Sequence, residues 1–451
     1  MTDREHQARA DRWTVAIAAS VLLVAAAGSS GAQDPSLKEF FRPAPDLAAS
    51  SPPDKVYPQG RIFPMTMFSV GGISGGKAPE KDLQAALKRY KAYGFTMMGP
   101  QYELNDRILD DAKAQGLKVL YTVGMPLKFH AKPPPEFTAQ DVEKAIKTQV
   151  LKVARDPQIG WWYLQPEELR YWRKNEMMYL ETAADTIRRT DPLKRPVWMY
   201  DPGHRVAEGL SHTAKRLDLC GKGLYTNYSG QRDSRIWVRW SIEQEIEGIK
   251  QSGASAIPIA VPEMFQQPDP EHLVMIPKWV RHDVYLSLVA GAKGVVVFSL
   301  RKRPKFAAHE AYYSAYGQVA RELCQTPGLG QVFLFGERRK DIRVEVLEGP
   351  KQIAPKEGTG GIRPPARKYL PASILDVAHK TGRYLFTVNS ANVPVRIRVK
   401  GLPDEKILGE DVFGSTQPLE IKQGTFELQF DPLDVKAIRF RPAGGRESKP
   451  D

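Results

Sequence analysis

The sequence predicts a (β/α)8 barrel followed by a small antiparallel β-sandwich, and three observations support this fold class. The chain of 451 residues is too long for one ordinary domain and suits a barrel with a smaller module. Short apolar stretches alternate with helix-like stretches over most of its length, as expected when helices cover parallel strands. After about residue 331 the helix-like stretches stop and only short strand-like ones follow, as in a sandwich.

The first 32 residues are predicted to form a secretory signal peptide. Arg9 and Arg12 precede an uncharged run over 13–27, which is short for a membrane span, and Ser30-Gly31-Ala32 fits a small-residue cleavage site. We expect cleavage after Ala32 and export to the periplasm or the cell exterior, with no stable membrane insertion afterwards. An uncleaved signal anchor is the alternative.

Residues 33–60 are rich in Pro, Ser and Ala and are expected to be a lead-in segment without a core of its own. The barrel is expected over 61–330, because eight strand candidates follow at intervals of roughly 20 to 40 residues. These candidates are 61–70, 95–99, 118–123, 159–164, 196–200, 221–226, 256–261 and 294–300. An open doubly wound sheet is the alternative, although no glycine-rich phosphate loop opens the chain.

Helical patterns separate the strand candidates. Leu83, Leu87 and Tyr90 recur at the spacing of one helix face, and Thr138 with Asp141 fits a helix N-terminus. The sandwich is expected over 335–441 and a short tail over 442–451. Its strand candidates are 342–346, 384–388, 395–399, 426–430 and 435–440.

Composition narrows the class of partner. The net charge of +13 favours an acidic partner such as an anionic polysaccharide, although scattered Lys and Arg residues are more typical of a solvated surface. No nucleic-acid motif accompanies these charges. The eight dispersed His residues and the absence of HExxH and CxxC predict no metal and no cofactor. Cys220 and Cys324 do not form a disulfide framework, and their pairing stays open.

Two predicted strands end on a glutamate. Strand four runs into Gln165-Pro166-Glu167-Glu168, and strand seven runs into Pro262-Glu263. Catalytic residues of barrel enzymes lie at the C-terminal strand ends, and strands four and seven lie on opposite sides of the ring. Glu167 and Glu263 can therefore face each other, which is the arrangement that glycosidic cleavage requires. The alternative for each is a surface glutamate at a strand–loop junction.

This layout resembles the clan-A glycoside hydrolases, which place an acid/base Glu after strand four and a nucleophile Glu after strand seven. The stretch Gly-Trp-Trp-Tyr-Leu-x-x-Glu, which starts at Gly160, is similar to their strand-four stretch Gly-Trp-Tyr-Leu-x-Asp-Glu-Pro. Matching Leu164 to the Leu of that stretch puts Glu167 at the acid/base position and Glu263 at the nucleophile position. The resemblance implies an exported glycosidase that acts with retention. The order of strands and helices is similar over residues 61–441, whereas the similar sequence motifs are limited to the ends of strands four and seven.

One residue departs from the resembled pattern. Pro166 stands where those families usually have Asn or Asp, so a group that contacts the sugar is missing. This departure leaves Glu168 as an alternative acid and a non-catalytic carbohydrate-binding barrel as the alternative function. A metal-assisted barrel hydrolase is a further alternative, which the scattered His residues disfavour.

Polar and aromatic side chains at the other strand ends are candidate contacts for an oligo- or polysaccharide, because sugars stack on aromatic rings and bond to polar groups. The candidates are Gln101, Tyr102, Trp162, Tyr200, Asp201, His204, Tyr225, Asn227, Tyr228 and Arg301, with Ser299 and Arg303 also following strand eight. The alternation of Trp161 and Tyr163 with Trp162 and Leu164 means that half of these aromatic side chains belong to the core.

Overall fold

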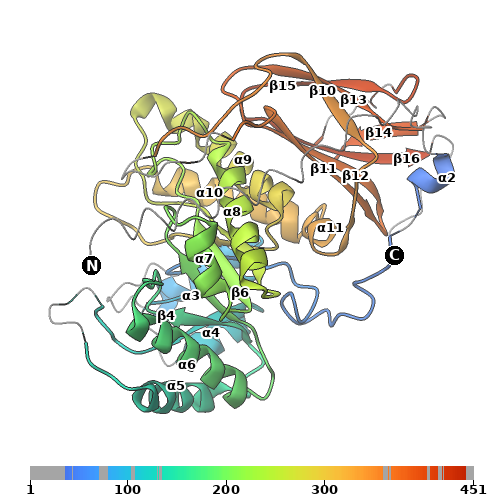
Figure 1. The fold of residues 1–451 in the computed structure, drawn as a ribbon. Helices are drawn as coiled ribbons and strands as arrows, with labels where there is room; N and C mark the ends of the chain where they lie inside the picture. The colour runs from blue at the N-terminus through green and yellow to red at the C-terminus, as the bar shows by residue number, and fades with distance from the viewer. Residues whose placement is uncertain are drawn as a thin grey trace, which may run out of the picture.

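The computed structural model describes residues 36–442 except 43, 71–79, 103–106, 130, 132–134, 359–363, 365–366, 404–406, 415–418 and 420. The expected signal peptide over 1–32 and residues 443–451 of the expected tail lie outside the described residues. The chain forms a parallel eight-stranded barrel with helices around it, followed by two antiparallel sheets (Figure 1). The predicted fold class is confirmed.

The barrel strands follow the ring in sequence order and pair in parallel throughout. They are β1 (Met65–Met67), β2 (Met97–Met98), β3 (Lys118–Gly124), β4 (Ile159–Gln165), β5 (Val197–Asp201), β6 (Leu219–Gly223), β7 (Ile257–Val261) and β8 (Val295–Val297). A backbone hydrogen bond of 3.1 Å from Thr96 N to Met65 O joins the β1 and β2 edges, so the ring is nearly closed. The first, second and eighth strands are shorter than predicted, and the sixth begins two residues earlier, because Leu219 and Cys220 also extend it.

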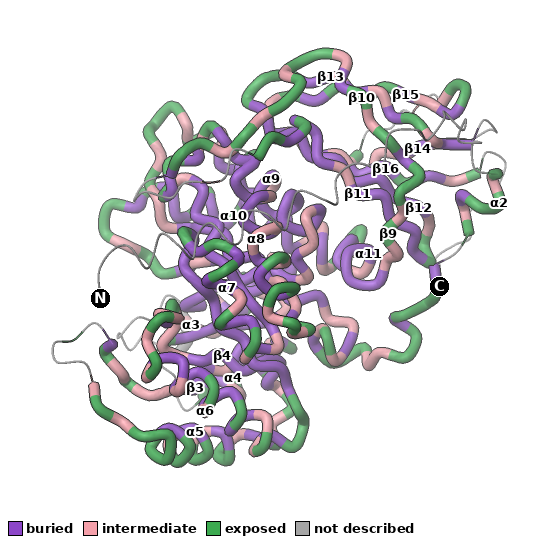
Figure 2. Tube along the Cα trace, in the orientation of Figure 1, coloured by how far each residue is buried: buried purple, intermediate pink, exposed green. Residues whose placement is uncertain are grey.

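Helices cover the outer face of this ring. They are α3 (Glu80–Ala92), α4 (Ile108–Ala114), α5 (Ala139–Val153), α6 (Lys174–Thr190), α7 (Ala207–Ala214), α8 (Trp237–Ser252), α9 (Ile276–Ala290) and α10 (His309–Cys324), with a 3-10 turn η1 (Pro270–Met275) before α9 and α11 (Gly330–Phe335) after α10. The expected start of α5 is confirmed, because Thr138 and Asp141 bond reciprocally as a capping box. Figure 2 shows exposed green turns along α5 and buried purple strands behind the helices.

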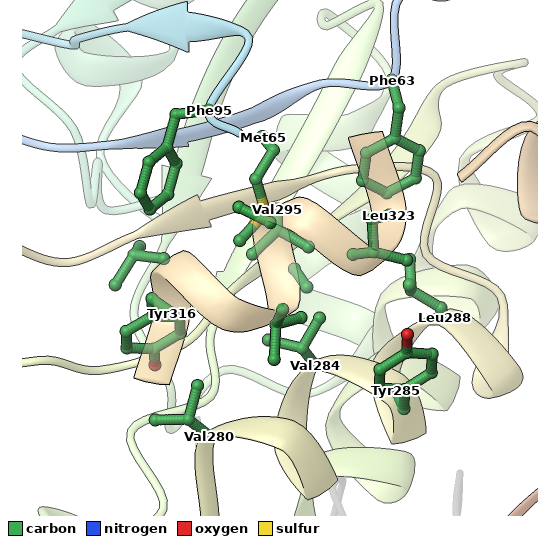
Figure 3. Packing of buried hydrophobic residues seen from close by; sticks show 14 of the residues in the cluster. Phe63, Met65, Phe95, Val280, Val284, Tyr285, Leu288, Val295, Tyr316 and Leu323 are labelled. Atoms are coloured by element: carbon green, nitrogen blue, oxygen red, sulfur yellow. The ribbon is translucent and has the colours of Figure 1, made fainter. Parts of the chain in front are cut away.

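Apolar side chains from the strands and the last helices form the core between ring and helices. Figure 3 shows Met65 and Val295 of β1 and β8 packed among Val284 of α9 and Tyr316 and Leu323 of α10. A separate cluster fills the inside of the ring, where Trp161 and Tyr163 of β4 point inward. The two faces of each strand therefore enter different cores, which decides which residues can reach the mouth.

The C-terminal region is a sandwich of two antiparallel sheets. The strands are β9 (Glu337–Arg339), β10 (Arg343–Glu348), β11 (Ala372–His379), β12 (Gly382–Asn389), β13 (Val395–Lys400), β14 (Ile407–Asp411), β15 (Phe426–Phe430) and β16 (Val435–Pro442), in the orders β10-β13-β15 and β14-β16-β12-β11-β9. The larger sheet packs on the barrel domain, where Phe386 of β12 lies 4.3 Å from Phe333 of α11 between ring centroids. Figure 1 shows the sandwich beside α9 and α11.

Residues before β1 contribute to the core of the sandwich and to the cluster inside the barrel. In the short helix α2 (Leu37–Phe40), Phe40 is buried against Phe440 of the sandwich, and its carbonyl accepts a 2.8 Å bond from Arg383. Val56 packs into the inner barrel cluster, where a Cβ added at Gly160 would lie 2.7 Å from Val56 Cγ2. This segment therefore covers the N-terminal end of the barrel, and only glycine leaves it room at position 160.

Candidate functional site

Glu263 lies two residues beyond β7 and is only 4% exposed. Its carboxylate accepts backbone N–H groups of Asn227, at 2.5 Å, and Tyr228, at 3.2 Å, which both belong to the loop after β6. Its carbonyl oxygen accepts a 2.9 Å bond from the Tyr316 hydroxyl of α10. Two neighbouring elements thus hold both the side chain and the backbone of Glu263.

Burial raises the pKa of Glu263 to about 7, against the lowering effect of the two backbone hydrogen bonds and of the Arg235 charge. A carboxyl group with this pKa exists in both protonation states near neutral pH. Proton transfer needs such a group, because it can give up a proton and take it back under the same conditions.

Glu167 lies two residues beyond β4 and is held by two tyrosine hydroxyls. Tyr102, in the loop after β2, donates to Oε1 at 2.8 Å, and Tyr163 of β4 donates to Oε2 at 2.6 Å. Burial, followed by the charge of Glu167, raises the pKa of both tyrosines, so they remain proton donors at physiological pH. Each carboxylate oxygen of Glu167 therefore accepts a hydrogen bond from one tyrosine hydroxyl.

Tyr225, after β6, lies among three carboxyl groups. Its pKa is raised by burial and then by the charges of Glu168, Glu167 and Glu263. Its ring is also packed 5.1 Å from Phe265, between ring centroids. Tyr225 is therefore within electrostatic range of both predicted catalytic glutamates and of the alternative acid.

Glu168, the alternative acid, occupies the left-handed region with φ of 58°. Partial burial at the mouth and the charge of Glu167 raise its pKa to about 7, although its side chain is exposed. Solvent screens charge effects at an exposed carboxyl group. Glu168 is therefore a weaker candidate for the acid than Glu167, whose two oxygens each accept a hydrogen bond from a tyrosine hydroxyl.

One hollow adjoins Glu167, and another lies beside the loop that holds Glu263. A groove of about 500 Å³ lies beside Glu167, and a polar pocket of about 260 Å³ lies beside Asn227, whose N–H binds Glu263. The groove is lined by Leu127, Lys128, Phe129, Ala131, Pro166, Glu167, Glu168, Arg170 and Glu176. Such volumes are near the range of small-molecule sites, about 300–1,000 Å³.

A buried network supports the loop that holds Glu263. The Asn227 side chain accepts a 3.0 Å bond from Arg235 of the loop before α8, and Arg235 pairs with Asp283 of α9. His282 contacts Asp283 through Nδ1 and Ser390 of the sandwich through Nε2, both at 2.9 Å. Burial alone would raise the pKa of Asp283, but the charge of Arg235 and the His282 bond outweigh it and lower the pKa.

Two predicted substrate contacts are wrong. Trp162 is fully buried on the outer face of β4, where its Nε1 donates to Asp191 at 2.8 Å. Asp201 is buried on the outer face of β5, where it pairs with Arg205 and accepts a 2.6 Å bond from Thr213. Both residues occupy the outward positions of their strands, so the pleat points them at helices instead of the mouth.

The remaining candidates lie at different depths. Tyr200 belongs to the inner barrel cluster below the mouth, and Gln101 is buried with its amide bonded to the Val70 carbonyl at 2.9 Å. Tyr102 and Tyr228 are 39% and 59% exposed and offer ring faces at the mouth. His204 is exposed in the loop after β5, where partial burial and then the charge of Arg205 lower its pKa. Arg301 is exposed after β8.

Sequence reasoning missed the functional neighbours that come from helices and loops. Arg235, His282 and Asp283 belong to no recognisable motif, and the sequence marks Tyr163 only as an aromatic side chain. The sequence does point to Tyr163, because a residue that faces the inside of the barrel four positions before Glu167 can direct its hydroxyl to the same end of the barrel. Phe265 also had a signal, since it follows Glu263 by two residues.

One group of possible metal ligands lies among the described residues. Within them, Asp269, Glu271 and His272 are the group whose ligand atoms lie within 4.8 Å of one another, but Asp269 also binds Arg232 at 2.9 Å. Cys220 in β6 and Cys324 at the end of α10 are free. In the part of the chain that the structure describes, no helix combines the length and apolar character needed to cross a membrane.

Comparison with solved structures finds the same architecture in carbohydrate-active enzymes. The chain is similar to a family 39 glycoside hydrolase from the gut symbiont Bacteroides cellulosilyticus WH2, with 12% identity and a TM-score of 0.53, over 84% of this chain and 81% of that one. A further glycoside hydrolase matches with 13% identity and a TM-score of 0.54, over 86% of this chain and 94% of that one.

A third similar structure is the alpha-amylase of Geobacillus thermoleovorans in complex with acarbose. It matches with 10% identity and a TM-score of 0.50, over 84% of this chain and 98% of that one. No protein-family model and no curated protein sequence matches the chain. At such low identity these likenesses show the fold alone, an eight-stranded parallel barrel with a C-terminal antiparallel sandwich.

Proposed function

We propose that this protein is a glycoside hydrolase that cleaves O-glycosidic bonds of an oligo- or polysaccharide. The observation that carries the proposal is the pair Glu167 and Glu263, each two residues beyond a barrel strand and both among the charges around Tyr225. Similar solved structures with glycosidase names support the same reaction class.

In the mechanism that we propose, Glu263 attacks the anomeric carbon while Glu167 protonates the departing glycosidic oxygen. A covalent glycosyl–enzyme intermediate forms at Glu263. Glu167, now ionised, then removes a proton from water, which attacks the anomeric carbon and releases the sugar with its configuration retained. Tyr102 and Tyr163 position Glu167, and the amides of Asn227 and Tyr228 position Glu263.

One observation favours the exchanged roles. The pKa of Glu263 is raised to about 7, as suits a proton donor, whereas the two tyrosine hydroxyls on Glu167 suit an ionised nucleophile. In both assignments the same pair reacts, so one set of variants distinguishes them.

The test uses an activated aryl glycoside, whose leaving group needs little protonation. In the first assignment Glu263→Ala abolishes turnover and Glu167→Ala spares it, and added azide rescues Glu263→Ala as the glycosyl azide of inverted configuration. In the exchanged assignment the two variants swap behaviour. NMR of the first anomer released by the wild type checks retention, and an inverted first product would contradict the retaining mechanism in both forms.

Pro166 supports a second candidate, a carbohydrate-binding barrel without catalysis. Pro166 lines the groove beside Glu167 and offers no side-chain hydrogen bond to a sugar hydroxyl. Calorimetry and hydrolysis assays on the same polysaccharide panel separate the two functions. Binding by wild type and by Glu263→Gln with turnover by neither would identify the binding protein.

We further propose that the protein is exported, that the signal peptide is cleaved after Ala32, and that the substrate is anionic. The order of basic, apolar and small residues over 1–32 supports export, and the net charge of +13 supports an acidic substrate. N-terminal sequencing of protein recovered from the envelope or medium tests the first proposal. A recovered chain that still begins at Met1 would contradict the cleavage.

A further inference from the structure

The loop after β8 is strongly cationic. Residues 299–306 read Ser-Leu-Arg-Lys-Arg-Pro-Lys-Phe, with four basic residues and no acidic one. Arg301, Lys302 and Lys305 are exposed, and their side chains form no ion pair with any described residue. The loop therefore places uncompensated positive charge beside the mouth of the barrel.

Arg303 is turned toward the mouth and is partly buried. Its Nη2 donates to Ser299 Oγ at 2.9 Å, and its Nη1 donates to the Met264 carbonyl at 3.5 Å and to the Arg301 carbonyl at 3.3 Å. Its Cζ lies 5.5 Å from the ring centroid of Phe265. All these partners are neutral.

Other arginines around the barrel mouth have carboxylate partners. Four of them pair in this way, namely Arg170 with Glu176, Arg205 with Asp201, Arg232 with Asp269 and Arg235 with Asp283. Among the described residues no carboxylate pairs with Arg303, so only neutral hydrogen bonds and ring contacts replace the water that its partly buried guanidinium loses. Burial and the nearby charge of Arg301 lower the pKa of Arg303, which agrees with such a position.

The location of Arg303 connects it to the reacting groups. Met264, whose carbonyl it binds, follows Glu263 directly, and Tyr102 and Tyr225 are among its electrostatic neighbours. Tyr102 in turn donates to Glu167. A guanidinium has five N–H donors, and the three bonds to Ser299, Met264 and Arg301 leave donors for a bound group.

We propose that Arg303, assisted by the charge of Arg301, recognises an acidic substituent on the sugar that lies beside Glu263. The substituent is an oxyanion, either the planar carboxylate of a uronate or a tetrahedral sulfate. A guanidinium binds both of these groups through paired hydrogen bonds. This inference rests on the proposed glycosidase function, because it takes the sugar subsite to be the mouth around Glu263.

The experiment uses matched glycan pairs and the full-length protein. A glycan array presents uronate oligosaccharides with their methyl esters, and sulfated oligosaccharides with their desulfated forms. Binding is measured with Glu263→Gln, and cleavage is measured with the wild type. The acidic member of a pair is expected to bind at least about tenfold more tightly, as a charged hydrogen bond implies. The pairs that show this preference tell whether the substituent is carboxylate or sulfate.

Two charge-matched variants separate recognition from general attraction. Arg303→Gln is expected to remove most of the preference for the acidic member while leaving the affinity for the neutral member within about twofold. Lys302→Gln removes the same charge from the same loop, on the side that lines a pocket with Arg89 and Tyr313, and should keep the preference. Arg303→Lys retains the charge without the planar fork, and should retain only part of the preference.

The outcomes of this experiment are distinct. Equal binding of acidic and neutral members, or equal loss in Arg303→Gln and Lys302→Gln, overturns the role of Arg303. Cleavage of neutral glycans alone overturns it as well and leaves the glycosidase proposal intact. An acidic glycan that binds through Arg303 but is never cleaved supports the inference and overturns the glycosidase proposal.

Discussion

At the residue scale, the ends of β4 and β7 hold their carboxyl groups in different ways. Glu263 is enclosed by protein and bonded to two backbone amides, whereas Glu167 is partly open and bonded to two tyrosine hydroxyls. Backbone amides are fixed by the chain, and hydroxyls can rotate to follow a change in protonation. The two sites therefore suit two different chemical roles.

The raised pKa of Glu263 predicts a pH-dependent stability. Between about pH 4.5 and 7 the folded protein keeps a proton that the unfolded chain has released, so wild-type stability falls as pH rises through this window. Glu263→Gln does not titrate. Its free energy of unfolding should therefore gain about 2 to 3 kcal/mol relative to wild type between pH 4.5 and 8, measured by urea denaturation. Glu208→Gln, at an exposed position of α7, is the control, and equal pH dependence of wild type and Glu263→Gln would contradict the shift.

The buried position of Trp162 predicts a structural and not a binding effect. Trp162→Phe removes the bond to Asp191 and part of the stacking with Arg195. We expect a loss of about 2 to 3 kcal/mol in unfolding free energy, because a buried acceptor loses a donor and a cavity opens. KM should stay within about twofold of wild type, which steady-state kinetics measures. A large rise in KM without loss of stability would restore Trp162 as a substrate contact.

At the scale of elements, α9 joins the barrel to the sandwich by polar as well as apolar contacts. Its consecutive residues His282 and Asp283 reach in two directions, to Ser390 after β12 and to Arg235 before α8. Arg235 then fixes the Asn227 side chain, whose backbone N–H binds Glu263. The helix therefore connects the sandwich to the support of one catalytic candidate.

This connection predicts graded effects of two substitutions. Asp283→Asn leaves Arg235 buried without a charge partner, so unfolding free energy should fall by about 3 kcal/mol and kcat by about tenfold or more as the Asn227 loop loosens. Ser390→Ala removes only the last partner and should cost about 1 kcal/mol with kcat unchanged. Denaturation and steady-state kinetics of both variants provide the measurement. Unchanged kcat in Asp283→Asn would mean that the network serves stability alone.

At the scale of the whole molecule, the sandwich completes the apolar core of the barrel domain. Val377 of β11 and Tyr384 and Phe386 of β12 belong to the same cluster as Tyr285 of α9 and Phe333 of α11. Burying apolar surface stabilises by about 25 cal/mol per Å², so this shared face contributes to the stability of both parts. The barrel is therefore not expected to be stable when the sandwich is removed.

Removal of the sandwich is a direct test. A chain that ends at Gly336 exposes the face formed by α9 and α11 and should aggregate or bind a hydrophobic dye, as destabilised proteins with apolar patches do. Deletion of 443–451 alone is the control and should leave the melting temperature within about 2 °C. A soluble, monomeric truncated barrel with the melting temperature of the full chain would contradict the prediction.

Local patterns in the sequence are enough to predict the barrel strands and the strand ends at which chemistry can occur. Continuous apolar runs with turn residues between them predicted all eight barrel strands, and the position of Glu167 and Glu263 after two of them followed directly. Three sandwich strands were not predicted, namely the short or polar β9 (Glu337–Arg339) and β14 (Ile407–Asp411) and the longer, apolar β11 (Ala372–His379). Strand pairing depends on neighbouring strands as well as on local pattern.

Which side chains reach the mouth, and what they contact there, depends on how the barrel closes. Trp162 and Tyr163 are adjacent in sequence, yet one faces the helices and the other donates to Glu167, because the barrel fixes which strand face is inside. The neutral partners of Arg303 among the described residues also come from different parts of the chain, namely Met264 after β7 and Ser299 after β8. Local sequence patterns set backbone conformation over a few residues, whereas burial, pairing and pKa arise from residues that only the closed barrel brings together.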